Sequence, residues 1–225
     1  MRVSSRAVIA GRVSGARNAA PVHTRRTAEP IDSPPPVSLA SMSPVESALA
    51  AQPVLTTERL TLVQLGPEHL ETTLAGLDDP DALRLTGTRG ELSRERVSAH
   101  LDRLPGASDR ADFAILDGTG AHIGEVVLNE FDLDNLAMSY RIALTAPSVR
   151  GRGYGTEAGR AVVEWAFSIG LHRIYLEVYA FNPSAQRSYE KIGFRHEGRA
   201  RDALRWGGEW TDAVLMSVLS TDPLP

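Results

Sequence analysis

The sequence predicts a mixed α/β (α+β) domain of about seven strands and four helices around one core. Apolar residues alternate with polar ones in some segments, which is typical of strands, and recur every three or four residues in others, which is typical of helices. Short polar links join the middle strands, whereas a glycine loop and a helix separate two later ones, so the sheet is expected to be mixed. The 225 residues, 42% apolar and 23% charged, fit a globular protein.

The first elements are a strand and two helices. Residues 55–65 alternate as a strand. Pro67 is placed to start a helix, and Ser93 to cap a second one, because Pro is favoured in the first helical turn and Ser at the N-cap. Apolar residues at helical spacing predict the buried faces of these helices: Leu70, Leu74, Leu77, Val97, Leu101 and Leu104.

Three strands are expected next, over residues 113–116, 123–131 and 136–144. The links between them are short and polar, one containing Gly118 and Gly120 and the other reading Asp-Leu-Asp-Asn. Links of this kind join antiparallel neighbours.

The second half begins with a glycine loop at 150–156 and a helix that Gly170 ends. An alternating strand over 173–181 and a short helix over 184–192 follow. Two last strands, 194–206 and 210–219, flank Gly207 and Gly208, a pair that accepts the positive φ angles of a tight hairpin.

Composition excludes several classes of protein. The chain has no Cys, which removes disulfide scaffolds, zinc-thiolate sites and thiol nucleophiles. Its apolar runs are far shorter than the ~20 residues that cross a bilayer. We expect no metal site and no nucleic-acid partner, because the aromatic residues are scattered and no metal-ligand spacing relates the histidines outside the first fifty residues: His69, His100, His122, His172 and His196.

Residues 1–50 are interpreted as a disordered tail rich in Arg, Ala, Pro and Ser, with six Arg against three acidic residues. Met42 as the true start, an organellar transit peptide and a basic arm for nucleic acid remain open explanations. The remainder has 18 basic and 25 acidic residues. The predicted domain covers residues 51–221, and residues 222–225 form a short C-terminal tail.

The glycine loop before the third helix is the strongest functional signal. Gly151, Gly153 and Gly155 leave backbone amides free to converge on a phosphate at the positive end of the helix. A Walker loop is excluded because Gly-Lys-Ser/Thr is absent. A dinucleotide fingerprint, with Glu177 24 residues beyond Gly153, and an ordinary turn that binds nothing remain alternatives. The fingerprint is disfavoured because Glu177 lies mid-strand.

Arg150-x-x-Gly153-x-Gly155, between a strand and a helix, resembles the acetyl-coenzyme A loop of the GNAT superfamily of N-acetyltransferases. The segments 182–185, Asn-Pro-Ser-Ala, and 189–194, Tyr-Glu-Lys-Ile-Gly-Phe, resemble the second signature of that superfamily. The likeness covers about residues 55–219. The hairpin ending in Trp-Thr-Asp-Ala at 210–213 is similar to the RimJ/RimL-type branch, named for enzymes that acetylate ribosomal-protein N-termini.

The resemblance implies a GNAT-type sheet with a splayed central parallel pair of strands, ending near Leu144 and Tyr179, that holds the pantetheine arm. An amide near Ala143 or Leu144 would polarise the thioester, and Asn182 would contact the pantetheine. Ala185 stands where many relatives carry Ser, so one hydroxyl contact would be missing. The pyrophosphate would lie on the amides of Arg150, Gly151, Arg152, Gly153, Tyr154, Gly155 and Thr156.

The resemblance also suggests catalytic residues. Glu177 is the expected general base, and Tyr189, twelve residues later, would protonate the departing thiolate. Glu125, on a strand that borders the acceptor cleft in related enzymes, is the reserve base. The alternatives are a strand carboxylate paired with Arg for Glu177, a core aromatic for Tyr189 and a solvated residue for Glu125.

The predicted reaction is direct transfer of acetyl from acetyl-CoA to a primary amine in a ternary complex. A protein or peptide α-amine is favoured, because its pKa of about 7.7 to 8.0 leaves more neutral nucleophile than a lysine at about 10.4. The negative charge of the folded part would also suit a polyamine or aminoglycoside. A non-catalytic acyl-CoA sensor is the rival from another class. We expect a cytoplasmic monomer or homodimer with no membrane partner.

Overall fold

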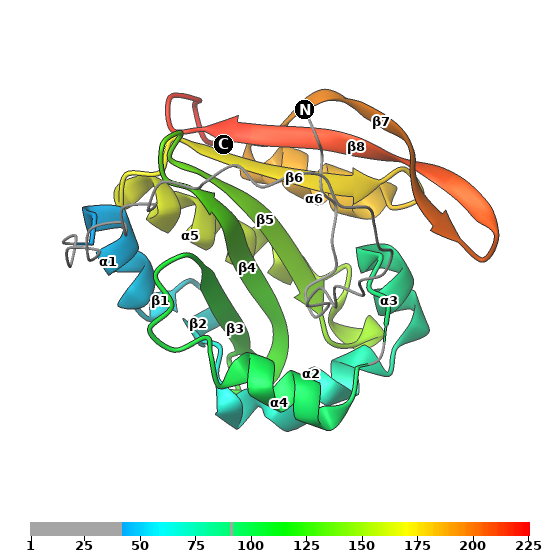
Figure 1. Cartoon of the computed structure of the whole chain (residues 1–225), viewed down its shortest axis with the longest axis horizontal. Helices are drawn as coiled ribbons and strands as arrows, with labels where there is room; N and C mark the ends of the chain where they lie inside the picture. The colour runs from blue at the N-terminus through cyan, green and yellow to red at the C-terminus, as the bar shows by residue number, and fades with distance from the viewer. Residues whose placement is uncertain (1–41, 91) are drawn as a thin grey trace, which may run out of the picture.

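The computed structural model describes residues 42–90 and 92–225, which form one mixed sheet and its covering helices (Figure 1). The sheet order is β1-β2-β3-β4-β5-β6-β8-β7, and all neighbours are antiparallel except β5 and β6. This architecture confirms the predicted fold class. The strands are β1 (Leu55–Thr56), β2 (Leu60–Gln64), β3 (Ala111–Asp117), β4 (His122–Asp132), β5 (Ala137–Leu144), β6 (Arg173–Tyr179), β7 (Arg195–Trp206) and β8 (Glu209–Leu219).

Six α-helices and two short 3₁₀ turns connect these strands within the described part of the chain. Figure 1 shows α5 and α6 behind the sheet and α2 and α4 at its lower end. The helices are α1 (Pro44–Ala50), α2 (Leu70–Leu77), α3 (Pro80–Thr86), α4 (Arg94–Leu101), α5 (Tyr154–Ser168) and α6 (Pro183–Ile192), with turns η1 (Pro67–His69) and η2 (Pro147–Val149).

The two faces of the sheet have separate apolar cores. The larger core joins α1, α5 and α6 to one face, where Tyr140 of β5 and Ile192 of α6 lie so close to Gly159 of α5 that a Cβ there would overlap both. The smaller core joins α2 and α4 to Ala114 on the opposite face of β3. Because side chains alternate along a strand, each face of β5 therefore meets a different set of helices.

The strand count differs from the predicted seven because residues 55–65 form two strands rather than one. β1 and β2 pair antiparallel, with Leu55 opposite Leu62 and Thr56 opposite Thr61. A turn at Thr57–Leu60 reverses the chain, and its backbone hydrogen bond runs from the amide of Thr57 to the carbonyl of Leu60 at 2.9 Å. The break falls in a run of four polar residues, Thr-Thr-Glu-Arg at 56–59, which interrupts the alternation and was a signal for the turn.

Two helices were not predicted, and one of them corrects the domain boundary. α1 packs Val45 and Leu49 into the larger core, so residues 44–50 belong to the folded part and not to the predicted tail. Ser43 and Glu46 cap it reciprocally, a signal that was present in the sequence. Residues 1–41, on which the remaining predictions for the tail fall, lie outside the described residues.

The second unpredicted helix, α3, follows Asp79, whose carboxylate accepts a hydrogen bond from the amide of Asp81. It ends at Gly87, which has a φ of 65°. Seven residues are too few to display a helical period, which is why the pattern did not predict this helix.

β5 and β6 separate along their length. Their parallel pairing covers only Ala137 with Arg173, Met138 with Ile174 and Ser139 with Tyr175, although the strands continue to Leu144 and Tyr179. Beyond Ser139 the two strands leave a wedge open between them, as the sequence resemblance implied. The C-terminal residues close the other end of the sheet, where Asp222 pairs with Arg195 at 3.1 Å.

Candidate active site

A cleft of about 1440 Å³ occupies the wedge between β5 and β6. Its walls come from α3 on one face of the sheet, from the start of α5 and from α6 on the other face, and from β7 at the side. Every residue predicted for cofactor binding except Arg152 lines this cleft, and so do Glu177 and Tyr189. Glu125 lines a smaller adjoining cavity instead.

The glycine loop reaches the cleft at the N-terminus of α5. Gly151 and Gly153 have φ angles of 72° and 84°, in the left-handed region that favours glycine. The amide of Glu157 bonds to the carbonyl of Gly153 at 3.0 Å, so the amides of the helical turn before it have no partner within the helix. This end of a fifteen-residue helix presents free N–H groups and the positive end of its dipole.

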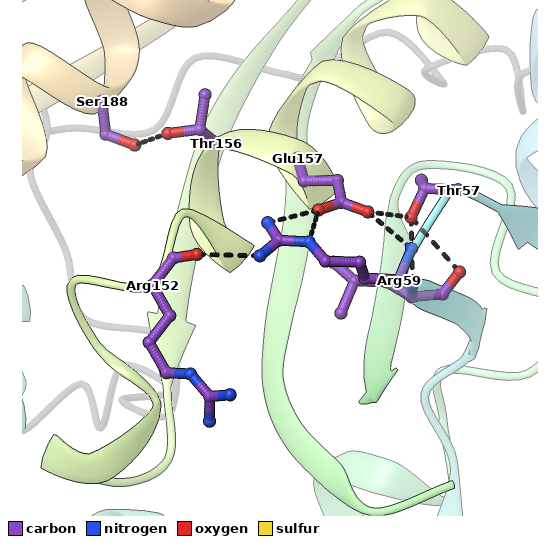
Figure 2. Close-up of polar contacts among 7 residues, drawn as sticks. Thr57, Arg59, Arg152, Thr156, Glu157 and Ser188 are labelled. Atoms are coloured by element: carbon purple, nitrogen blue, oxygen red, sulfur yellow. Dashed lines mark hydrogen bonds and ion pairs between the residues drawn. The ribbon is translucent and has the colours of Figure 1, made fainter. Parts of the chain in front are cut away.

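The loop is held by a cluster of polar contacts around Arg59, shown in Figure 2. Arg59 donates from Nε to Glu157 at 2.7 Å and from Nη1 to the carbonyl of Arg152 at 3.0 Å. Thr57 donates to the other oxygen of Glu157 at 2.6 Å. Although burial favours the neutral acid, the hydrogen bonds from Thr57 and Arg59 keep the pKa of Glu157 below its usual value. The contacts fix the loop to the turn between β1 and β2.

Two further contacts tie the same helix start to its surroundings. Thr156 and Ser188 share a hydrogen bond of 2.6 Å that links α5 to α6 (Figure 2). The ring of Tyr154 lies beneath the guanidinium groups of Arg59 and Arg152, at 4.8 and 4.9 Å from its centroid. The N-terminus of α5 is therefore fixed before any ligand binds, which lowers the entropic cost of ordering it.

Arg150 makes side-chain contacts for which the sequence analysis made no prediction. Its guanidinium pairs with Asp79 at 2.6 Å and donates to the carbonyl of Leu144 at 3.2 Å. The side chain thus joins the cap of α3 to the end of β5, and the backbone amide of Arg150 already donates to the carbonyl of Pro147 at 3.2 Å. No sequence pattern indicated Asp79 as its partner, because the two residues are 71 positions apart.

The end of β5 shows which amides face the wedge. The amide of Thr145 donates to the carbonyl of Ile123 in the neighbouring strand β4 at 3.0 Å. Amides two residues apart point the same way along a strand, so Ala143 faces β4, whereas Leu144 faces the wedge. The bond from Arg150 to the carbonyl of Leu144 agrees with this orientation.

Asn182 and Tyr189 lie on α6 and its cap. The Oδ1 atom of Asn182 accepts from the amide of Ala185 at 3.1 Å, so this oxygen caps the helix. Tyr189 is 92% buried, and its ring meets Tyr140 and Phe194 edge-on, each at 5.9 Å between centroids. Burial raises the pKa of Tyr189 to about 12, so its hydroxyl is protonated at neutral pH. No hydrogen bond holds that hydroxyl within the described residues.

Both candidate carboxylates lie on the face of the sheet that α3 covers. Glu177 is half-buried on β6 and lines the main cleft. Glu125 lies opposite Ala143 in the register of β4 and β5, and its cavity of about 90 Å³ adjoins the cleft. Burial first, and then the charge of Asp112, raises the pKa of Glu125 to about 7, although Arg141 and Arg110 oppose the shift. A carboxylate with this pKa is suited to accept a proton near neutral pH.

The sequence prediction missed Arg141, which lies at the junction of the cleft and the smaller cavity and lines both. A signal existed, because an arginine in the middle of an otherwise apolar central strand is uncommon and often functional. It was overlooked because the strand was interpreted only for its backbone amides. Arg59 and Glu157 were also missed, since their roles follow from contacts across 98 positions of the chain.

Comparison with known proteins identifies the family. The family model described as an acetyltransferase (GNAT) domain matches residues 59–195, more than half of the chain. The protein therefore belongs to the GNAT acetyltransferases and is an N-acetyltransferase that transfers acetyl groups. The narrower RimJ/RimL-type assignment stays a prediction.

Individual relatives agree with this class. The chain is 31% identical over 134 residues to the probable N-acetyltransferase YjcK of Bacillus subtilis, which covers 59% of this chain and 74% of the relative. It is 30% identical over 110 residues to the spermidine N(1)-acetyltransferase of Vibrio cholerae, which covers 48% of this chain and 63% of the relative.

Solved structures share the fold. A spermidine N-acetyltransferase from Vibrio cholerae, in complex with CoA and spermine, matches with a TM-score of 0.68 and 23% identity, over 74% of this chain and 98% of that one. A GNAT acetyltransferase from Bacillus anthracis matches with a TM-score of 0.66 and 23% identity, over 76% of this chain and 100% of that one.

The described residues contain neither a helix that could span a membrane nor a cluster that could hold a metal ion. Across residues 42–90 and 92–225, no helix is both long and apolar enough to cross a membrane. Within the same ranges, no group of three or more His, Cys, Asp or Glu side chains is arranged to hold a metal ion.

Proposed function

We propose that the protein transfers acetyl from acetyl-CoA directly to a primary amine that binds on the α3 side of the wedge. The observation that carries this proposal is the continuity of one cleft from the N-terminus of α5, through the gap between β5 and β6, to the face that carries Glu177. A cofactor on one side and an acceptor on the other would meet at the gap. Direct transfer then needs no covalent intermediate on the enzyme.

The residues present fit the CoA thioester. The free amides of Tyr154, Gly155 and Thr156, with the loop amides from Gly151 onward, would hold the pyrophosphate at the positive end of α5, whereas the amide of Arg150 already donates to Pro147. Of the two predicted oxyanion donors, the alternation of amides supports Leu144 over Ala143, because only Leu144 faces the wedge. The free amide group of Asn182 would contact the pantetheine arm, since its oxygen is already used as a helix cap.

Proton transfer is assigned to two side chains. The amine nitrogen would form its bond to the thioester carbonyl carbon and lose a proton to a carboxylate. We propose Glu125 for this role, because its raised pKa matches a base that works near neutral pH, and we retain Glu177 as the alternative. As the carbon–sulfur bond breaks, Tyr189 would donate its proton to the departing thiolate.

Two classes of acceptor amine are compatible with these residues. A peptide α-amine remains the favoured acceptor on the RimJ/RimL-type resemblance. A small amine is the alternative acceptor, since one relative is named a spermidine N(1)-acetyltransferase. The predictions of a cytoplasmic monomer or homodimer without a metal, a nucleic-acid partner or a membrane partner also stand as proposals.

The function is tested by following thiol release from acetyl-CoA with a panel of peptides and small amines. We expect turnover with at least one acceptor and saturable binding of acetyl-CoA by calorimetry. Binding of acetyl-CoA without turnover on any acceptor would favour the acyl-CoA sensor. Binding of NADH instead of CoA would favour the dinucleotide interpretation of the loop.

A further inference from the structure

Arg141 is a charged side chain at the floor of the cleft that has no hydrogen-bond partner. Its Nη1 atom is sealed from solvent and makes no hydrogen bond, and no ion pair to it is found among residues 42–90 and 92–225. A buried guanidinium has five donors, and leaving them unpaired costs free energy that a native protein normally avoids.

Glu125 is the opposite charge nearest to it in the sheet register. Glu125 stands opposite Ala143, and Arg141 stands opposite Val127, so the two side chains are diagonal neighbours on one face of β4 and β5. Both line the smaller cavity, yet they form no ion pair with each other within the described part of the chain. Each charged group therefore remains available to a ligand between them.

The surroundings do not supply a partner by other means. Burial lowers the pKa of Arg141 from its usual value, and the negative charges that oppose this shift act at a distance, first among them Glu125 and last Glu130. The phenols of Tyr179 and Tyr189 complete the titratable groups around the guanidinium. None of these four groups makes a hydrogen bond to Arg141 in the described structure.

We propose that Arg141 binds a carboxylate of the acceptor, and that the acceptor is an amine that carries this carboxylate a few bonds from the nitrogen that reacts. The proposal rests on the transferase function above and narrows its substrate class. Glu125 and Arg141 would receive the positive and negative ends of the same molecule. A carboxylate would satisfy two donors of the guanidinium at once, the geometry for which arginine is best suited.

The same arrangement disfavours a polyamine. An acceptor with only ammonium groups would place a positive charge beside an unpaired, partly desolvated guanidinium, and like charges at close range in a low dielectric repel. Two sources of the carboxylate are chemically equivalent at this point. One is a free amino acid, and the other is the acidic side chain of an N-terminal Asp or Glu in a peptide.

The experiment compares matched acceptors that differ only in the carboxylate. Free L-amino acids are assayed against their carboxamides, and peptides that begin with Asp or Glu against the same peptides that begin with Asn or Gln, with spermidine as a further acceptor. We expect kcat/KM to be about 30-fold or more higher for the carboxylate member, since losing one partner of a desolvated charge pair has that scale of effect. Whichever pair shows the preference identifies the source.

Variants assign the preference to Arg141. Arg141→Gln should bring the preference close to one, and Arg141→Lys, which keeps the charge without the planar fork, should retain part of it. Arg89→Gln is the matched control, because Arg89 lines the same cleft but stacks on Trp206 at 5.1 Å. Arg89→Gln should keep most of the preference for carboxylate acceptors. This result would separate a direct contact with Arg141 from general electrostatic attraction by positive charges in the cleft.

A purely structural role for Arg141 predicts a different result. Since Arg141 makes no hydrogen bond in the described structure, Arg141→Gln should not lower the thermal midpoint. A clear loss of stability, with an unchanged carboxylate preference, would overturn the proposal. Equal kcat/KM for both members of every pair, or fastest turnover with spermidine, would overturn it as well and would leave the transferase function intact.

Binding measurements by calorimetry separate a failure of the carboxylate site from a failure of the transferase function. If acetyl-CoA binds but no acceptor is acetylated, the carboxylate and carboxamide members are titrated into the wild type and into Arg141→Gln. Binding of the carboxylate member that the variant loses would support the carboxylate site and contradict the transferase function. Failure of every carboxylate to bind would overturn the proposed site.

Discussion

The two sides of the wedge are built in different ways. On the α5 side, the loop is held by side chains whose hydrogen bonds are satisfied, and the groups proposed to bind the cofactor are backbone amides. On the α3 side, the groups that face the cleft and its adjoining cavity are ionisable side chains, and the Nη1 atom of Arg141 makes no hydrogen bond in the described structure. The proposed function therefore assigns the first side to the cofactor, which is constant, and the second side to a particular acceptor.

This difference predicts that substitutions on the two sides alter different measured quantities. Changes on the α5 side should alter the binding of acetyl-CoA with little effect on pH dependence. Changes on the α3 side, and at Tyr189 of α6, should alter kcat with little effect on the cofactor, and the pH profile should follow the carboxylate on the α3 side. Four experiments test this division, beginning with the largest expected effect.

Removing the proposed base should have the largest effect. Glu125→Gln should lower kcat/KM by about 10²- to 10⁴-fold, the usual range for loss of general-base catalysis. In the wild type, kcat/KM should fall tenfold per pH unit below about 7, because Glu125 must be deprotonated to accept a proton and its pKa is about 7. The Glu125→Gln variant should lose this acidic limb of the pH profile and keep only the limb that reports deprotonation of the acceptor amine. A larger loss in Glu177→Gln than in Glu125→Gln would transfer the role to Glu177.

Removing the proposed acid should have the next largest effect. Tyr189→Phe should lower kcat by roughly 100-fold, because a single proton-transfer group contributes on that scale. The dissociation constant of acetyl-CoA, measured by calorimetry, should change little. Tyr175→Phe is the control, because Tyr175 also lines the cleft but its hydroxyl already donates to Glu130 at 3.3 Å. Equal effects of the two substitutions would remove Tyr189 from the acid role.

A change in the loop backbone should affect the cofactor side alone. Gly153→Ala forces a side chain into a φ of 84°, which costs about 1 to 2 kcal/mol, and should raise the KM for acetyl-CoA about tenfold if the loop shifts to relieve it. Gly207→Ala imposes similar strain at a φ of 59° in the hairpin between β7 and β8. It should cost similar stability in a thermal melt with no change in KM. A raised KM in the hairpin variant would mean that the effect is global.

The side chains that hold the loop should have the smallest effect. Arg59→Gln and Glu157→Gln should each raise the KM for acetyl-CoA by about two- to five-fold, since a partly exposed ion pair contributes about 0.2 to 1 kcal/mol. The double variant should be no worse than either single one. Arg94→Gln breaks an exposed pair with Glu71 of the same 2.6 Å length and should leave KM unchanged. Additive losses would show that Arg59 and Glu157 act separately.

The sequence predicted one side of the site better than the other, for a physical reason. The loop at 150–156 was visible because positive φ angles and close approach of a phosphate both demand glycine at fixed spacing. Of the pair formed by Arg141 and Glu125, only Glu125 was predicted. Glu125 was named as a reserve base, but nothing in the sequence specified which residue of the next strand would stand diagonal to it, because register depends on the whole sheet.

The sequence by itself determined the order of most strands and helices, the family and the position of the glycine loop, because these depend on local periodicity and on residues close together in the chain. Only the tertiary structure decided that residues 44–50 are folded, that Arg150 pairs with Asp79, and that β5 and β6 separate beyond Ser139. These features depend on contacts between segments far apart in the sequence. Packing and strand register create them, and no local pattern encodes either.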